Sequence, residues 1–185
     1  MIKVDVLAIG AHPDDVELGC GGTLAKLISE GKKVAIVDLT QGELGTRGTN
    51  FTRAEEAAEA SKILRISARE NLRMKDGFIQ NSEEYQMKIV TMIRKYQPEI
   101  VLSNAIDDRH PDHAKASKLV SDACFLSGLV KIETVLEGKN QQPWRPKHIF
   151  NYIQWKNITP DFVIDITDFM QKKIDTCLAY KTQFY

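Results

Sequence analysis

The fold is decided near the start of the chain, by the stretch VDVLAIGAHPDD at residues 4–15. Residues 4–9 form a short apolar run rich in β-branched side chains and bounded by Gly10, which predicts a buried strand. The AHPDD sequence at residues 11–15 then gathers one histidine and two carboxylates around a proline that fixes the turn. The stretch therefore predicts a strand that delivers chemically active side chains at its carboxyl end.

Strand patterns alternate with helix patterns over the rest of the chain. Further strands are expected at residues 34–39, 71–78, 99–103, 149–153 and 162–166. Helices are expected at residues 23–30, 52–64, 82–96, 113–125 and 168–180. This alternation predicts an α/β fold with a mostly parallel sheet and helices on both faces. Ligands of such folds bind beyond the carboxyl ends of the strands.

Size and composition limit the class of protein. The 185 residues suit a single domain spanning residues 1–185. The 25 basic and 25 acidic side chains cancel, so neither nucleic acid nor a membrane is expected as a partner. No apolar run approaches the roughly 18 residues of a membrane span, and residues 1–5 do not resemble a signal peptide. The cysteines (Cys20, Cys124 and Cys177) are widely spaced, which predicts free thiols in a reducing cytoplasm.

A second motif, DDRHPDH at residues 107–113, follows the strand expected at residues 99–103. Pro111 suits the first turn of a helix. His110 and His113 are three residues apart, so they lie on one face of that turn. With His12, these two place three of the four histidines of the chain in two short motifs. Such clustering favours a functional site over scattered surface histidines.

Imidazole and carboxylate groups together favour Zn²⁺, and a catalytic zinc takes three protein ligands and leaves a position open for water. The candidate ligands are His12, Asp15 and one of His110 and His113, and the spacing does not decide between these two histidines. The alternative for the first motif alone is a histidine of the core followed by an aspartate that caps a helix.

The remaining polar groups of the two motifs have complementary roles. Asp14 is expected to be the general base that accepts a proton from the water. The histidine that does not bind zinc is expected, in its protonated form, to stabilise the oxyanion and to protonate the leaving amine. Asp112 could hold that histidine in the charged form and orient it.

Two other segments follow expected strands. Arg53 opens the helix expected at residues 52–64, where Thr52 and Glu55 have capping-box spacing, and it could clamp a substrate carboxylate. The alternative is that Arg53 pairs with Glu56 on its own helix. The glycine-rich residues 19–22 resemble a phosphate-binding turn but lack the G-x-G-x-x-G spacing, so close packing is the expected role.

These residues resemble the PIG-L/LmbE-like family of N-acetylglucosamine deacetylases. The family signature AHPDD stands at residues 11–15, and its His-x-x-His signature stands at residues 110–113. The TQGE turn at residues 40–43 and the TRAEE helix start at residues 52–56 match as well. The resemblance covers essentially the whole chain, and it implies a Rossmann-like three-layer α/β/α fold.

The resemblance also implies roles for individual residues. It implies one Zn²⁺ per chain, bound by His12, Asp15 and His113. Asp14 is implied as the general base and His110 as the electrostatic partner of the oxyanion. Asp112 is implied to orient His110, and Arg53 to contact the substrate.

The implied reaction is hydrolysis of the N-acetyl group of small GlcNAc-type amino sugars. Within the family the sequence looks most similar to the Bacillus enzymes of bacillithiol synthesis, which deacetylate GlcNAc-malate. A malate carboxylate would suit Arg53, and also Arg47 or Arg109. Family members assemble into homo-oligomers such as hexamers. They also continue beyond the position of Tyr185, and the segment absent here would supply further substrate-side residues and part of the subunit interface.

Two other functions are weighed against deacetylation. A Rossmann-type nucleotide-binding protein would use the glycine-rich residues 19–22 and would bind a dinucleotide independently of a chelator. A non-catalytic zinc-containing sugar-binding module would bind GlcNAc derivatives without releasing acetate.

Overall fold

The computed structural model describes residues 2–184 and contains a five-stranded sheet with the strand order β3-β2-β1-β4-β7. Every neighbouring pair in this sheet is parallel, which confirms the predicted sheet type. Its strands are β1 (Val6–Gly10), β2 (Val34–Thr40), β3 (Ala68–Met74), β4 (Ile100–Ser103) and β7 (His148–Asn151). The short strands β5 (Val135–Leu136) and β6 (Lys139–Asn140) form a separate antiparallel hairpin.

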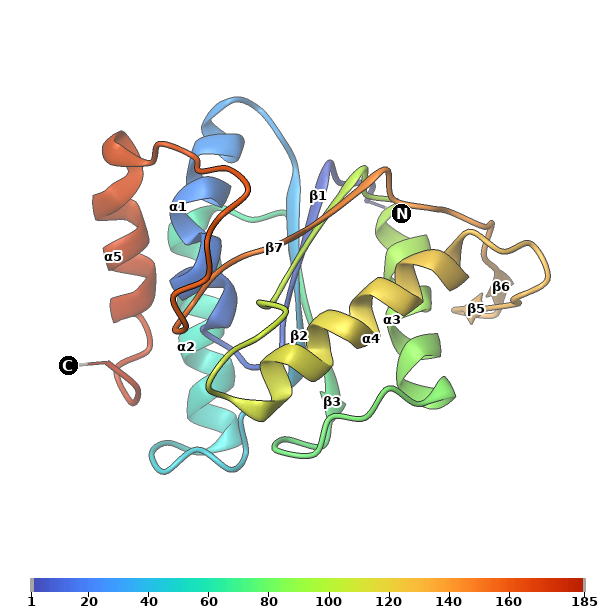
Figure 1. Cartoon of the computed structure of the whole chain (residues 1–185), viewed down its shortest axis with the longest axis horizontal. Helices are drawn as coiled ribbons and strands as arrows, with labels where there is room; N and C mark the ends of the chain where they lie inside the picture. Colours follow the sequence, from blue (N-terminus) through green and yellow to red (C-terminus); the bar gives the residue numbers. More distant parts are fainter. Residues whose placement is uncertain (1, 185) are drawn as a thin grey trace.

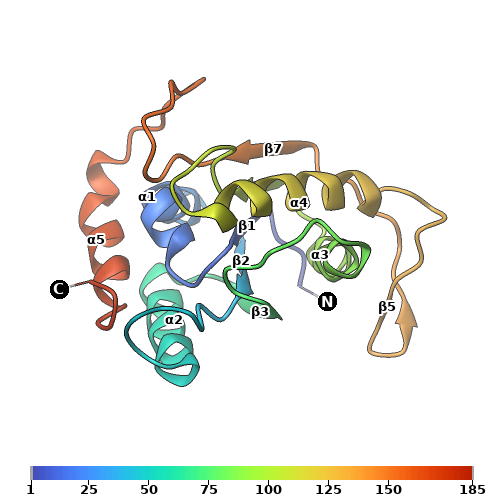
Figure 2. The same cartoon turned by 60° about the horizontal axis from the view of Figure 1, so that its bottom comes forward.

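Helices cover both faces of the sheet, as Figures 1 and 2 show. The helices α1 (Asp15–Ser29) and α2 (Asn50–Leu64) lie on one face, and α3 (Glu83–Tyr96) and α4 (Pro111–Ser127) lie on the other. The last helix, α5 (Met170–Leu178), follows a single 3₁₀ turn (Thr167–Phe169) and packs outside α1 and α2. The predicted three-layer α/β/α fold is confirmed, with α5 added outside one layer.

The burial of β1 explains why its sequence is apolar without interruption. Leu7 and Ile9 belong to the core between the sheet and the α3/α4 layer. Val6 and Ala8 point the other way, into the core beneath α1. Because side chains alternate between the two faces of a strand, a strand covered on both faces needs apolar residues at every position.

Helix α1 begins at Asp15, eight residues before the start predicted from apolar spacing. The glycines of residues 19–22 therefore lie inside a helix, where they allow close contacts. A Cβ on Gly19 would lie 2.2 Å from the ring of Tyr152, and one on Gly22 would lie 2.5 Å from Ile166. The predicted packing role is thus borne out, and no phosphate-binding turn forms at these described residues.

Other element boundaries also differ from the predictions. Helix α2 is capped by Thr49, whose side chain accepts a hydrogen bond from the Thr52 backbone N–H, while the Thr52 side chain accepts one from the Thr49 backbone N–H. The cap therefore lies three residues before the predicted capping residue, Thr52. Strand β3 begins three residues earlier than predicted. The apolar residues 162–166 do not form a strand, and Phe162 and Val163 are exposed to solvent. An apolar run predicts burial, but it does not by itself supply a neighbouring strand to pair with.

The free state of the three cysteines agrees with the prediction, since none of them forms a disulfide. Within residues 2–184, no helix has both the length and the apolar character needed to cross a lipid bilayer.

The order of the strands places the two sequence motifs side by side. Strands β1 and β4 are neighbours in the sheet, but the chain leaves β1 toward α1 on one face and leaves β4 toward α4 on the other. A crevice opens at the carboxyl ends of two strands whose connections diverge in this way. Residues that follow each of these strands, such as His12 after β1 and His113 after β4, line one cavity.

Candidate metal centre

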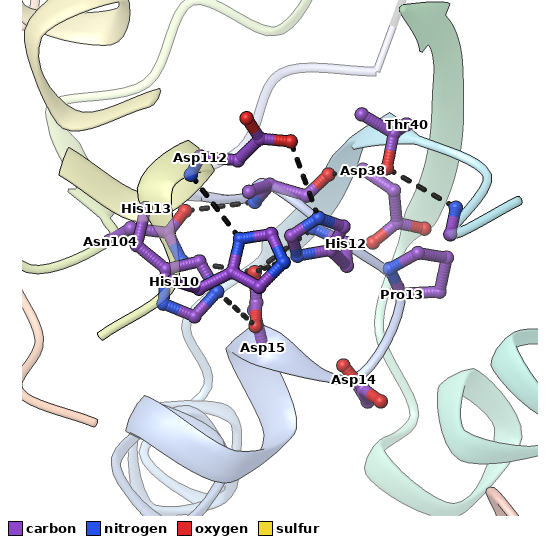
Figure 3. A network of polar contacts seen from close by, with 12 residues as sticks. His12, Pro13, Asp14, Asp15, Asp38, Thr40, Asn104, His110, Asp112 and His113 are labelled. Atoms are coloured by element: carbon purple, nitrogen blue, oxygen red, sulfur yellow. Dashed lines mark hydrogen bonds and ion pairs between the residues drawn. The ribbon is translucent and has the colours of Figure 1, made fainter. Parts of the chain in front are cut away.

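The Asp15 carboxylate lies between two histidine rings from different parts of the chain (Figure 3). Its Oδ2 is 3.3 Å from His12 Nδ1, and its Oδ1 is 3.2 Å from His113 Nε2. Asp15 opens α1, whereas His113 lies in the first turn of α4, on the opposite face of the sheet. The structure thus brings together the three residues that the family resemblance implies as zinc ligands.

Several donors hold the Asp15 carboxylate in place. Its Oδ2 accepts from the His12 backbone N–H at 2.9 Å and from Asn104 Nδ2 at 3.0 Å. Its Oδ1 accepts from Gln154 Nε2 at 2.9 Å. Burial raises the pKa of Asp15, but hydrogen bonds from His113 and His12 outweigh it and hold the pKa well below its ordinary value. The buried carboxylate is therefore ionised.

Each of the two rings also faces a second carboxylate. His12 Nε2 lies 3.0 Å from Asp76 Oδ1, and His113 Nδ1 lies 3.3 Å from Asp108 Oδ2. A carboxylate behind a histidine fixes the proton on the near nitrogen and turns the lone pair of the other nitrogen toward the centre. Asp76 was missed in the sequence, and Asp108 was part of the second motif but received no role.

His110 lies at the N-cap of α4, beside the other two rings. Its ring centroid is 4.5 Å from that of His12 and 5.1 Å from that of His113. Its Nδ1 accepts from the Asp112 backbone N–H at 3.2 Å, which leaves the proton on Nε2. Burial and the neighbouring His12 and His113 lower the pKa of His110. The protonated form of His110 that we expect from the sequence during catalysis stays a prediction.

The Asp112 carboxylate does not make the predicted contact with His110. It accepts from the backbone N–H groups of Gly77 at 2.7 Å and Ile79 at 3.3 Å, and it lies 3.6 Å from His12 Nε2. The prediction relied on closeness in sequence, but the first turn of α4 directs this side chain toward the loop after β3. The Asp112 backbone N–H donates to the His110 ring, and the charge of the Asp112 carboxylate acts to raise the pKa of His110, in the predicted direction.

Asp14 and Arg53 form an ion pair beside the centre. Asp14 is the N-cap of α1 and has a φ of 109°, a strained conformation for a residue with a side chain. Arg53 is 4% exposed, and its Nη2 contacts Asp14 Oδ2 at 3.2 Å and the Pro13 carbonyl oxygen. Burial and the charge of Asp15 raise the pKa of Asp14 to about 8, although Arg53 opposes this. The alternative pairing of Arg53 with Glu56 is wrong, because Glu56 binds Thr182.

A cavity of about 560 Å³ opens over this centre. Its floor is polar, and its rim carries apolar side chains such as Leu44 and Trp155. Arg109 lines the cavity, and its role in substrate binding stays a prediction; Arg47 is absent from the lining. The Arg47 carbonyl oxygen instead accepts from Gln183 Nε2 at 3.1 Å. Gln154 and Trp155 also line the cavity, and no sequence signal had marked them.

The donor groups suit a divalent metal ion. Two imidazole nitrogens and one carboxylate converge at Asp15, and this is a donor set that catalytic zinc takes in proteins. Ring nitrogens of His12, His110 and His113, one from each, also lie within 4.8 Å of one another. A second set of donor atoms within this distance belongs to His12, Asp76 and Asp112, and both of its carboxylates face Nε2 of His12.

Comparison with known proteins adds to this geometry. Residues 7–124 match the sequence model of the family described as PIG-L, GlcNAc-PI de-N-acetylase. The chain is 31% identical to the diacetylchitobiose deacetylase of Thermococcus kodakarensis, over 97% of this chain and 70% of that protein. It is 26% identical to the 1D-myo-inositol 2-acetamido-2-deoxy-alpha-D-glucopyranoside deacetylase of Mycobacterium leprae, over 86% of this chain and 67% of that protein.

A solved structure is also closely similar. The crystal structure of a conserved protein from Thermus thermophilus superposes with a TM-score of 0.90 at 41% identity, covering 98% of this chain and 80% of that one. The substrates in the names of the two enzymes above are a chitobiose and an inositol conjugate, so these matches do not single out GlcNAc-malate.

Proposed function

The chain belongs to the PIG-L family of deacetylases, and from this premise we propose that it is a zinc-dependent hydrolase that removes the N-acetyl group of GlcNAc-type sugars. The observation that carries the proposal is the Asp15 carboxylate between the ring nitrogens of His12 and His113, on the floor of an open cavity. Asp14 and His110 line the same cavity, within reach of a substrate bound there.

In this proposal His12 Nδ1, Asp15 and His113 Nε2 hold the zinc ion. Asp76 and Asp108 support the choice of these atoms, because Asp76 bonds the other nitrogen of His12 at 3.0 Å and Asp108 lies 3.3 Å from the other nitrogen of His113. Bound zinc would supply a Lewis acid that activates water and polarises the acetyl carbonyl.

The residues of the chain itself perform the proton transfers. In its ionised form, which the charge of Arg53 favours, the Asp14 carboxylate accepts a proton from the attacking water, as a general base. His110 carries its proton on Nε2 and donates a hydrogen bond to the oxyanion that forms at the acetyl carbonyl. The C–N bond then breaks while Asp14 passes the proton that it accepted to the leaving amine nitrogen, and the products are acetate and a free amino sugar.

Arg53 has a positioning role in this account. Its guanidinium holds the Asp14 side chain and the Pro13 carbonyl oxygen, and thereby fixes the turn that carries the base. It also lines the cavity, so it can contact a substrate there.

The group attached to the amino sugar has two candidates. GlcNAc-malate, the substrate of bacillithiol synthesis implied by the sequence resemblance, is supported by Arg109 at the cavity, where it could bind a carboxylate. A second sugar ring, as in diacetylchitobiose, is supported by the relative from Thermococcus kodakarensis and by Trp155 at the rim. We retain the predictions of a cytoplasmic homo-oligomer as part of the proposal.

Zinc content and acetate release, measured on two variants, test the proposal. Asp14→Ala should keep its zinc by elemental analysis but lose acetate release from GlcNAc substrates, because only the base is removed. His113→Ala should lose both. Full zinc occupancy in His113→Ala would contradict the ligand set, and would point to the alternative group of His12 and His110.

A further inference from the structure

Asn104 is a fully buried residue whose amide joins several parts of the chain at the metal centre (Figure 3). It directly follows β4, and because it is 0% exposed, its polar atoms need partners inside the protein. Its Oδ1 accepts from the Ala11 backbone N–H at 2.8 Å, and its backbone carbonyl oxygen accepts from Asn151 Nδ2 at 2.7 Å. Asn104 is therefore held both by the segment after β1 and by β7.

The Ala11 backbone decides which way the Asn104 amide points. A backbone N–H can only donate, so the side-chain atom that it meets must be the amide oxygen. The amide nitrogen of Asn104 is then directed to the other side, where it donates to Asp15 Oδ2 at 3.0 Å and to Gln154 Oε1 at 2.8 Å. The reverse orientation would place the amide oxygen against the Asp15 carboxylate, and neither group would have a proton to donate.

The orientation of Asn104 in turn decides that of Gln154, which lies beyond the end of β7. Because Gln154 Oε1 accepts from Asn104, Gln154 Nε2 is the atom left for Asp15, and it donates to Asp15 Oδ1 at 2.9 Å. One backbone N–H thus sets the direction of two amides in series. We call these two amides the amide relay, and it ends in one N–H donor on each oxygen of Asp15.

We propose that Asn104 and Gln154 are positioning residues that act as one unit, and that the two N–H donors of the amide relay hold Asp15 in the orientation in which it binds the metal ion. This inference rests on the proposed function, in which Asp15 is a zinc ligand. With the His12 backbone N–H, the relay gives Asp15 three hydrogen bonds that must break before the carboxylate can turn. Hydrogen bonds of this kind orient a ligand and raise the affinity for its metal.

The amide relay has a consequence that two separate contacts do not have. Without Asn104, no group fixes the Gln154 amide, so its oxygen and nitrogen can exchange places by rotation. Loss of Asn104 should therefore also remove most of the contribution of Gln154 to zinc binding. Two contacts that act independently would instead give losses that add.

The test is a double-mutant cycle on zinc affinity, measured by competition with a chelating dye. We expect Gln154→Met to raise the Kd for zinc about 5- to 10-fold and Asn104→Leu about 10- to 100-fold. The double variant should match Asn104→Leu within about twofold. Gln183→Met is the matched control and should bind zinc like wild type, because Gln183 also lines the cavity but donates to the Arg47 carbonyl oxygen.

A second pair of measurements separates positioning from folding. Asn104→Leu leaves the buried Ala11 N–H without its acceptor, so this variant should also be less stable. Gln154→Met removes no backbone partner, and its metal-free form should unfold in urea like wild type. The visible spectrum of the cobalt-loaded protein reports the arrangement of the ligands, and it should change in Gln154→Met but not in Gln183→Met.

Losses of zinc affinity that add in the double variant would overturn the amide relay, and so would an unchanged Kd in Gln154→Met. If Asn104→Leu did not fold, Gln154→Met would decide: a raised Kd with wild-type stability supports positioning, and a wild-type Kd overturns it. If wild type bound zinc but released no acetate, the proposed reaction would fail while the zinc affinities still decided the role of Asn104 and Gln154. A wild type that bound no zinc would overturn both.

Discussion

His12 Nε2 lies 3.0 Å from Asp76 Oδ1, on the side of the imidazole opposite to Asp15. Burial raises the pKa of Asp76, but the hydrogen bond with His12 outweighs it and lowers the pKa to about 2. The ionised Asp76 therefore keeps the proton of His12 on Nε2 and leaves Nδ1 free to bind a metal ion. Asp76 also accepts from the Leu44 backbone N–H at 2.8 Å, so it joins the centre to the loop after β2.

Replacing Asp76 should weaken zinc binding without unfolding the protein. We expect Asp76→Asn to raise the Kd for zinc by about 10- to 100-fold. The asparagine amide can still orient the His12 ring, but it lacks the negative charge that makes His12 a stronger zinc ligand. Competition with a chelating dye measures this Kd. Asp122→Asn, which changes an exposed-face aspartate paired with Lys118, is the control and should bind zinc like wild type. An unchanged Kd in Asp76→Asn would rule out this role.

His110 should matter for the rate and not for metal content. We expect His110→Gln to retain zinc and to lower kcat about 100- to 1,000-fold, with a small change in KM, since it removes a donor to the oxyanion. The control is His148→Gln, because His148 lies on β7 and stacks on Phe150, away from the cavity lining. Loss of zinc from His110→Gln would instead show that His110 is a metal ligand.

A buried ion network below the centre should be important for stability. Arg69 Nη1 lies 2.6 Å from Glu17 Oε1, and Arg69 Nε lies 2.7 Å from Asp38 Oδ2. We expect Arg69→Met to lower the free energy of unfolding by about 3–5 kcal/mol, because it leaves two buried carboxylates without their cation. Urea denaturation measures the change. Lys62→Met, which breaks the exposed pair with Glu59, should cost less than about 1 kcal/mol, and similar losses in both would contradict this account.

Glu56 should hold the segment that forms part of the cavity wall. Its two carboxylate oxygens accept from the Thr182 backbone N–H at 2.7 Å and from Thr182 Oγ1 at 2.8 Å, and the following Gln183 and Phe184 line the cavity. In Glu56→Ala, hydrogen–deuterium exchange should speed up in residues 180–184, and KM should rise more than kcat falls. Glu59→Ala, on the exposed face of α2, is the matched control. Unaltered exchange in Glu56→Ala would show that other contacts hold the segment.

The sequence predicted the parts of the site whose residues are adjacent in the chain. The motifs at residues 11–15 and 107–113 each follow an apolar strand, and neighbouring parallel strands bring their carboxyl ends to one edge. Asp76 and Gln154 could not be found in this way. Asp76 is 64 residues from His12, and Gln154 is 139 residues from Asp15, so only the folded topology joins them.

The element boundaries were wrong where tertiary contacts override local patterns. Helix α1 starts early because Asp14 takes a positive φ and the glycines after it let Tyr152 and Ile166 approach. The predicted strand at residues 162–166 has the right composition, but it does not pair with the sheet. The Asp112 side chain binds the backbone of Gly77 and Ile79 and not the His110 ring for a related reason, because a helical turn separates the directions of side chains that are close in sequence.

The most direct test of the central claim is acetate release from N,N'-diacetylchitobiose by the same protein sample before chelation, after chelation and after adding back one equivalent of zinc. We predict that acetate is released by the zinc-loaded protein, that release stops when the metal is removed, and that one zinc per chain restores it. Acetate release that continues unchanged in the metal-free protein would contradict the account.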